Sequence, residues 1–398
     1  MTGVGGARER DEGAGRPAAG WIDGPAALEA LVQRLRGATR LALDTEADGF
    51  SAYRPRLCLI QLAWEEPGGL AFALVDPLAL QGRLDPLAGP LQDPALETIV
   101  HGADYDVRLL KRDAGISPRG LWDTQRAAQL AGEAQTGLAA LAAALAGATL
   151  DKRAQRTDWA RRPLSSTALD YAREDVRVLF AMRDALGARL AALGRSAWQD
   201  EECRRLEEVE PGEPTPPDAD QLLGRTKGAP ALSPRVRAVL AELLLWRERE
   251  AASRAVPAIH VVAPEPLVAL AGQPVDSPAD LAAAGVPARV LHRYERALVE
   301  AIERGRAAPP RPVERPERPP KPPRDERRRL DALRQARDRI ATELGLPGSL
   351  LCTGAALREA AHVPPSDVAG WLAIGLRRWQ ADLLAGPFGA ALDSLLAP

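Results

Sequence analysis

Two proline-rich stretches most constrain what this chain can fold into, because they divide it into three parts. Residues 207–230 are rich in proline, glutamate and glycine, residues 307–326 in proline and arginine, and both interrupt the helical spacing around them. Such segments act as extended linkers between domains. In a chain of 398 residues, we therefore expect a disordered lead-in at 1–20, a first domain at 21–206, and helical domains at 231–306 and 327–398.

The first of these parts alternates strand-like and helix-like segments. Strands are expected at 41–43, 57–63, 70–75 and 98–100, and helical spacing dominates from there to about residue 205. Strands in succession, then strands alternating with helices, predict a mixed sheet covered by helices, an α/β fold. The two later parts show helical spacing only, and Ser233-Pro234 is a typical helix start. Their similar plan suggests that the last part is a divergent copy of the one before.

Composition argues against several classes of protein. The net charge is −2, so no overall charge directs the chain toward nucleic acid or membrane. Three widely separated cysteines argue against a disulfide framework and favour a reducing, cytoplasmic compartment. Four separated histidines argue against a histidine-based zinc site, so carboxylates would have to hold any metal. We also expect no signal peptide and no membrane span, because no apolar run is long enough.

The end of the first strand carries two acidic side chains. Asp44 and Glu46 follow Leu41–Leu43 and should leave the sheet on the same side, because a strand alternates its faces. Neighbouring carboxylates repel unless a cation lies between them. Carboxylate oxygens suit Mg²⁺ or Mn²⁺, so the pattern indicates half of a metal site. A solvated acidic turn is the alternative, since this spacing is common.

Two further segments supply acidic residues. Asp104 stands where a helix N-cap is expected, whereas Asp106 can point back over the sheet edge, so we assign Asp104 to capping and Asp106 to the metal. Tyr171 and Asp175 are four apart on a helix and share a face, although a simple hydrogen bond on the helix surface would also explain them. Four carboxylates could hold two divalent cations, with Tyr171 orienting a water molecule.

These residues resemble the three motifs of the DEDD superfamily of exonucleases, in its tyrosine-bearing subclass. The motifs are Asp44-Thr45-Glu46, His101 to Asp106, and Tyr171 to Asp175; the sequence at 57–62, 122–125 and 151–164 is similar to ribonuclease D. The resemblance implies a ribonuclease-H-like fold and 3′-to-5′ release of nucleoside 5′-monophosphates from RNA, in the maturation of transfer-RNA 3′ ends. It implies that Asp44, Glu46, Asp106 and Asp175 bind two Mg²⁺ or Mn²⁺ ions and that Tyr171 orients water.

The two helical parts resemble the HRDC domain, a helical nucleic-acid-binding module. The likeness rests on residues 246–251, Arg254, Pro257 and 267–271 in the first part, and on 344–347 and Trp379 in the second. It implies RNA as the partner of these domains, and we expect a monomer. From this plan, we also expect that residues 231–398 can be removed while cleavage of a short single strand survives.

A basic cluster precedes the third motif. Lys152, Arg153, Arg156 and Arg162 could hold an RNA backbone, with Trp159 as a base-stacking surface. Alternatively, the loop is solvated and Trp159 packs in the core. Residues 306–329 hold a second local excess of positive charge, which could contact phosphates or be a solvated spacer.

Two other functions remain open at this point. One is a DNA exonuclease of the same superfamily, because the motifs do not distinguish RNA from DNA. The other is a catalytically inactive nucleic-acid-binding protein whose helical domains carry the function.

Overall fold

The computed structural model describes residues 20–48, 53–151, 157–212, 216–275, 277–313 and 323–395. The chain forms two compact units. The first contains Met1–Glu46, Leu57–Pro211 and Lys321–Pro398, and the second contains Ala47–Arg56 and Gly212–Pro320. The disorder predicted for the lead-in falls, except for Gly20, outside the described residues.

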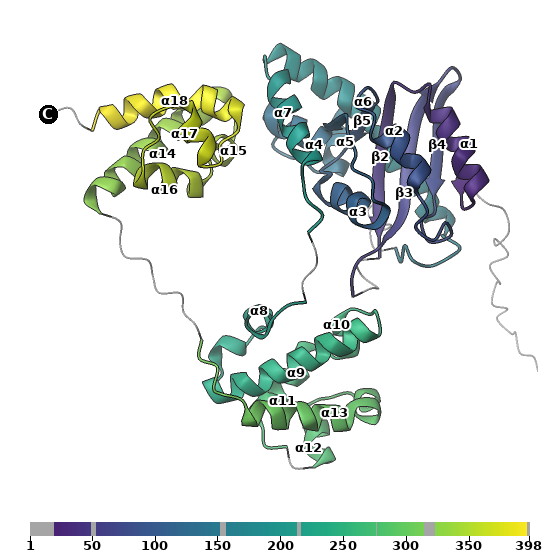
Figure 1. Ribbon diagram of the computed structural model, residues 1–398, viewed down its shortest axis with the longest axis vertical. Coiled ribbons are helices and arrows are strands. Elements are labelled where there is room, and N and C mark those ends of the chain that lie inside the picture. The colour runs from purple at the N-terminus through teal and green to yellow at the C-terminus, as the bar shows by residue number, and fades with distance from the viewer. Residues whose placement is uncertain are drawn as a thin grey trace, which may run out of the picture. The chain divides into compact units, whose positions relative to one another are not determined.

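The first unit contains a mixed six-stranded sheet (Figure 1). The strand order is β1-β4-β3-β2-β5-β6, with β1 at Trp21–Ile22, β2 at Arg40–Ala47, β3 at Leu57–Glu66, β4 at Gly69–Val75, β5 at Glu97–Val100 and β6 at Leu121–Asp123. β3 and β4 are antiparallel, whereas β5 is parallel to both β2 and β6. The predicted α/β class and the four predicted strands are confirmed. β1 and β6 are too short to show a period in the sequence.

The helices between residues 25 and 207 pack on this sheet or follow its strands in the chain. They are α1 (Pro25–Leu35), α2 (Ala88–Leu91), α3 (Asp104–Ala114), α4 (Thr124–Ala131), α5 (Leu138–Leu145), α6 (Ser166–Ala192) and α7 (Ser196–Glu207). The long helix α6 starts at the N-cap Ser165, whose hydroxyl accepts a hydrogen bond from the Ala168 amide at 3.2 Å. Apolar side chains of α4, α5 and α6 form one core with Ala42, Ala63 and Ile99 of the sheet.

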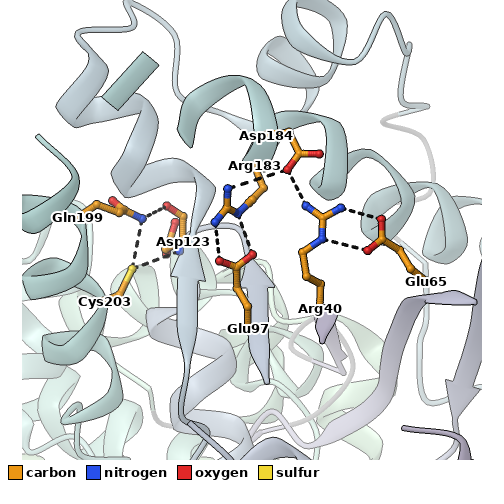
Figure 2. A network of polar contacts seen from close by, with 8 residues as sticks. All are labelled: Arg40, Glu65, Glu97, Asp123, Arg183, Asp184, Gln199 and Cys203. Atoms are coloured by element: carbon orange, nitrogen blue, oxygen red, sulfur yellow. Dashed lines mark hydrogen bonds and ion pairs between the residues drawn. The ribbon is translucent and has the colours of Figure 1, made fainter. Parts of the chain in front are cut away.

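Ion pairs fix α6 against the sheet (Figure 2). Arg40, at the start of β2, donates to Asp184 of α6 at 2.6 Å and to Glu65 of β3 at 2.6 Å. Arg183 of α6 donates two hydrogen bonds to Glu97, at the start of β5, at 2.7 and 2.6 Å. α6 is therefore paired directly with two strands, β2 and β5, and is linked through Arg40 to β3.

This attachment sets the register of α6 along β2. Asp175 precedes Asp184 by nine residues, and a helix rises 1.5 Å per residue, so about 13 Å separate them. Asp44 follows Arg40 by four residues, and a strand rises ~3.3 Å per residue, which also gives about 13 Å. An anchor between Arg40 and Asp184 therefore brings Asp175 level with Asp44.

The last helices belong to this same unit. They are α14 (Arg324–Leu344), α15 (Gly348–Leu351), α16 (Gly354–His362), α17 (Val368–Ala373) and α18 (Arg378–Asp393). The ring of Trp379 stacks on Trp198 of α7 at a centroid distance of 4.5 Å, and its indole N–H donates to Glu202 at 2.9 Å. Glu201 accepts hydrogen bonds from the first amides of α18, those of Arg378 and Trp379, at 2.6 and 3.0 Å.

The expectation that residues 231–398 can be removed as a block is not supported by this packing. Glu202 is 4% exposed and pairs with Arg377, so deletion would leave a buried carboxylate without its partners. The deletion would also uncover the apolar core that α14 and α18 share with α4 and α6.

The second unit is helical. Its helices are α8 (Ala219–Arg225), α9 (Pro234–Ser253), α10 (Ala258–Val261), α11 (Pro264–Gly272), α12 (Pro278–Ala283) and α13 (Ala288–Ala307). Ser233 caps α9 as predicted, accepting a hydrogen bond from the Val236 amide at 3.4 Å. Helices α9 to α13 have 20, 4, 9, 6 and 20 residues, and α14 to α18 have 21, 4, 9, 6 and 16, so the two sets follow one plan.

Cys58, Cys203 and Cys352 are all buried and none of them forms a disulfide in the described structure, in agreement with the prediction of no disulfide framework. In the part of the chain that the structure describes, no helix combines the length and the apolar character that crossing a membrane requires.

Trp379→Ala is expected to lower the free energy of unfolding of the first unit by about 3–5 kcal/mol, because it removes a large buried side chain. Trp379→Phe keeps a ring but loses the donor to Glu202, and should cost about 1–3 kcal/mol. Urea unfolding followed by circular dichroism measures both. Val363→Ala, at a residue that is 63% exposed on the same set of helices, should change stability by less than about 0.5 kcal/mol. An unchanged midpoint for Trp379→Ala would contradict the packing described.

Candidate metal centre

Three carboxylates meet where the second half of β2 lies beside the first half of α6. Asp44 and Glu46 extend from β2 and Asp175 from α6, and each offers an oxygen within 4.8 Å of the others. The predicted placement of Asp44 and Glu46 on one side of the strand is therefore what the structure shows. Asp175 is 2% exposed, and its Oδ1 has no hydrogen-bond partner among the described residues.

Asp106 approaches the same place from α3. It lies in the first turn of this helix and is buried, and the hydroxyl of Thr45 donates a hydrogen bond to its carboxylate. The group of three carboxylates does not include Asp106, but its charge acts on Asp44 and Glu46. Thr45, the residue between the two acidic positions of β2, thus joins the second motif to the first.

The predicted capping role of Asp104 is wrong. The N-cap of α3 is Ala103, which has no side-chain capping bond, and Asp104 instead binds Arg108 of the next turn at 2.8 Å. The amides of Gly102 and Ala103, just before α3, are bound by the carboxylate of Asp123 at 3.0 Å each. Sequence spacing missed this partner because it lies twenty residues away, although an aspartate between a strand and a helix is itself a signal for a cap.

Burial and mutual repulsion favour the protonated forms of these acids. Burial, then the charges of Asp106, Glu46 and Asp175, raises the pKa of Asp44 well above its usual range. Burial and the neighbouring carboxylates raise the pKa of Glu46 to about 8. Burial also raises the pKa of Asp175 to about 7 and that of Asp106 to about 6, against hydrogen bonds from Tyr171 and Thr45 respectively.

This donor set fits divalent cations. In the described ranges, no lysine or arginine forms an ion pair with Asp44, Glu46 or Asp175. A cluster of carboxylates with raised pKa values and an unpartnered buried oxygen is stabilised by a bound cation of hard character. The oxygens of Asp44, Glu46 and Asp175 could hold such an ion directly.

Tyr171 lies one helical turn before Asp175 and hydrogen-bonds to its carboxylate. Burial, followed by the negative charge of Asp175, raises the pKa of the phenol far above neutral pH. Tyr171 is therefore a hydrogen-bond donor here and not a base. Its ring lies 6.4 Å from that of Trp159, tilted by 36°.

The predicted base-stacking role of Trp159 is wrong, because its ring is only 2% exposed and packs in a core with Cys58, Leu59 and Ala172. Trp159 packs in the core, which is the alternative that the sequence left open, and Tyr171 packs against the same core. The neighbouring Arg162 is engaged within the protein: it donates to Asp76 at 2.7 and 2.8 Å and to the carbonyl oxygen of Cys58 at 2.8 Å. Lys152, Arg153 and Arg156 lie outside the described residues.

Comparisons with known proteins agree on one family. A family model described as 3′-5′ exonuclease matches residues 20–191, and one described as 3′ to 5′ exonuclease C-terminal domain matches residues 312–392. Ribonuclease D of Acidiphilium cryptum is 33% identical over 72% of this chain and 72% of its own length. Ribonuclease D of Xanthomonas oryzae is 37% identical over 66% of this chain and 69% of its own.

A solved structure extends this agreement. The crystal structure of Escherichia coli RNase D, described as an exoribonuclease involved in structured RNA processing, is 25% identical with a TM-score of 0.64. The match covers 94% of this chain and 98% of that one.

The raised pKa values predict a pH dependence of stability in EDTA. The folded protein retains protons on Glu46 up to about pH 8, whereas the unfolded chain releases them near 4.5. Stability should therefore fall as the pH rises through this window, by a few kcal/mol, since one pKa unit corresponds to about 1.4 kcal/mol. Thermal melts from pH 5 to pH 8.5 measure it; Glu46→Gln should flatten the fall, and added Mg²⁺ should oppose it. A melting temperature that rises across this range in EDTA would contradict the electrostatic description.

Proposed function

This chain belongs to the ribonuclease D family, and from that membership we propose that it hydrolyses RNA one nucleotide at a time from the 3′ end. The family implies a ribonuclease-H-like exonuclease fold for the sheet of the first unit. The observation that supports the activity most directly is the meeting of Asp44, Glu46 and Asp175 within 4.8 Å, from segments far apart in the sequence. The proposed reaction is 3′-5′ exoribonucleolytic cleavage that releases nucleoside 5′-monophosphates.

In this proposal, Asp44, Glu46 and Asp175 hold divalent cations, Mg²⁺ or Mn²⁺, and Asp106 contributes from α3. When bound, the cations would lower the pKa of a water molecule and neutralise charge on the phosphodiester. The protein residues fix where this happens: β2 presents two carboxylates on one side, α6 presents the third level with them, and Thr45 directs Asp106 toward the strand.

Tyr171 has a separate role in the proposal. Its phenol stays protonated at neutral pH, so it can donate a hydrogen bond but cannot remove a proton. We assign it to the orientation of the attacking water, with Asp175 and the buried ring of Trp159 holding the side chain in place.

For the second unit, we propose an HRDC-type domain that contacts the RNA backbone. Its helix α13 exposes four basic side chains at spacings of three and four, which place them on one helix face: Arg289, His292, Arg293 and Arg296. Arg289, Arg293 and Arg296 are exposed cations, Arg296 also within 2.8 Å of Glu300, and a row of arginines on a small helical domain suits phosphates. Following the family, we propose 3′ extensions of transfer-RNA precursors as the substrate and a monomer as the active form.

The two alternative functions make different predictions. A DNA exonuclease would degrade a DNA oligomer at least as fast as an RNA of the same sequence. A competition assay between the two oligomers therefore shows which nucleic acid the enzyme prefers. An inactive binding protein would bind both without Mg²⁺-dependent cleavage. The raised pKa values and the unpartnered Asp175 oxygen favour a cation-dependent enzyme over a passive binder.

Asp44→Asn and Asp175→Asn are each expected to lower Mg²⁺-dependent shortening of a 5′-labelled RNA by at least about 10³-fold, because both remove oxygens that would hold the cation. The double variant should cost little more than either single one, since such ligands act together. Tyr171→Phe leaves the carboxylates in place and should lower kcat by about 10²-fold, with little change in KM.

EDTA should stop cleavage in the wild type, and circular dichroism should show that the variants remain folded. Full activity in both folded aspartate variants would refute the nuclease site. A folded Tyr171→Phe variant with unchanged kcat would refute the role of Tyr171 alone.

Replacing Arg289, Arg293 and Arg296 together by alanine is expected to weaken binding of a structured RNA. The slope of log affinity against log salt should fall in magnitude by about 0.7–0.9 for each phosphate that the variant no longer binds. Cleavage of a short single strand should keep its kcat. Arg34→Ala removes one arginine that is 50% exposed in the first unit and serves as the control. An unchanged affinity and salt slope in the triple variant would contradict the proposed role of α13.

A further inference from the structure

Asp123, the last residue of β6, is fully buried and binds backbone amides of two separate segments. Its Oδ1 accepts from the amides of Gln125 and Arg126, at the start of α4, at 2.7 and 3.1 Å. Oδ1 also accepts from Gly102, and Oδ2 from Ala103, at 3.0 Å each. One carboxylate therefore serves the N-cap of α4 and the turn that leads into α3.

The start of α3 depends on this distant residue. The N-cap residue of α3, Ala103, has no side-chain capping bond, and the amides of Gly102 and Ala103 that lead into the helix are bound by Asp123. A helix start without such a partner leaves donors unpaired, which costs free energy when they are buried, and Ala103 is fully buried. Asp123 therefore holds the turn immediately before α3, and Asp106 lies within the first turn of the helix that follows.

Thr124 adds a second tie at the same place. Its hydroxyl donates to the carbonyl oxygen of Val100 at 2.9 Å and lies 2.8 Å from Nδ1 of His101. A hydroxyl has one hydrogen to donate, so the Nδ1 of His101 must carry the proton in this contact. The end of β5 and the residue after it are thus bound to the start of α4.

Two residues of α7 contact the backbone of Asp123 (Figure 2). Gln199 donates to the backbone oxygen of Asp123 at 2.9 Å, and the Asp123 amide lies 3.3 Å from the sulfur of Cys203. Three neighbouring residues of α7 contact α18 instead: Trp198, Glu201 and Glu202.

We propose that Asp123 is a positioning residue for the metal centre: by binding the amides of Gly102 and Ala103, it fixes the start of α3 and so the carboxylate of Asp106 against Thr45 and β2. The inference rests on the proposed function, because it takes the carboxylates near Asp44 as the cation site. The groups around a metal site that hold its ligands in place typically affect metal affinity by 10- to 100-fold.

The unequal use of the two oxygens makes Asp123→Asn a selective variant. The amide oxygen of asparagine can take the place of Oδ1, which accepts three of the four bonds, so the cap of α4 can survive. The amide nitrogen would then face the N–H of Ala103, donor against donor, so within the turn before α3 only the amide of Ala103 loses its acceptor. Asp123→Asn should therefore loosen α3 while the rest of the fold remains.

Titration calorimetry with Mn²⁺, on the full chain without RNA, tests the inference. We expect Asp123→Asn to bind Mn²⁺ about 10-fold more weakly and to need about 10-fold more Mg²⁺ for half-maximal cleavage. At saturating Mg²⁺, kcat should largely recover, and KM for RNA should stay unchanged. A purely structural role would lower the melting temperature but leave the Mg²⁺ dependence where it is.

Glu66→Gln is the matched control, because it breaks an ion pair with Arg34 of α1 at the end of β3 and leaves the contacts that position α3 and α6 in place. It should lower the melting temperature with unchanged Mn²⁺ affinity. If Asp123→Asn does not fold, Thr124→Val decides: it removes one hydroxyl from the same tie and should weaken Mn²⁺ binding by a few-fold.

A folded Asp123→Asn protein with wild-type Mn²⁺ affinity and wild-type Mg²⁺ dependence would overturn the inference. So would wild-type affinity in Thr124→Val when Asp123→Asn is unfolded. If the wild type binds Mn²⁺ at Asp44 but cleaves no RNA, the proposed function fails while the affinities still decide the role of Asp123. A wild type that binds no Mn²⁺ overturns both.

Discussion

Mutual repulsion among buried and half-buried carboxylates is the constraint on which the rest of the first unit depends. Asp44, Glu46 and Asp175 lie within 4.8 Å of one another, with Asp106 close by, and the pKa of each is raised. Without a cation, this arrangement favours protonation or separation of the acids. A protein that keeps these carboxylates together must therefore position each one through contacts with the rest of the fold.

The scaffold does this through contacts at some distance from the acids. The ion pairs of Arg40 and Arg183 hold α6 in register with β2 and β5, which fixes Asp175. The carboxylate of Asp123 and the hydroxyl of Thr45 hold α3, which fixes Asp106. Because α7 binds Asp123 on one side and α18 on the other, the C-terminal helices support the same centre. This explains why they form one compact unit with the sheet although a proline-rich stretch precedes them.

The two errors of sequence reasoning at the site have one physical origin. In the sequence, Asp104 stands where the N-cap of a helix is expected, and Trp159 is an aromatic residue among basic ones, as in a base-stacking surface. In the structure, Arg108 binds Asp104, and Trp159 is buried beneath Tyr171. Both outcomes depend on which residues compete for the same position in space. That competition involves segments such as β6 and β3, whose approach no local pattern describes.

What the sequence determined by itself follows from short-range periodicity. A strand alternates its faces, so Asp44 and Glu46 had to share one; a helix repeats every 3.6 residues, so Tyr171 and Asp175 had to share one. Carboxylates without histidines restricted the site to hard cations. Tertiary structure alone decided that Asp123 binds the turn before α3, that Trp159 lies inside, and that the last helices join the first unit. These results depend on burial and on contacts between residues 20 to 178 positions apart in the sequence. Burial is a property of the packed chain that no single segment carries.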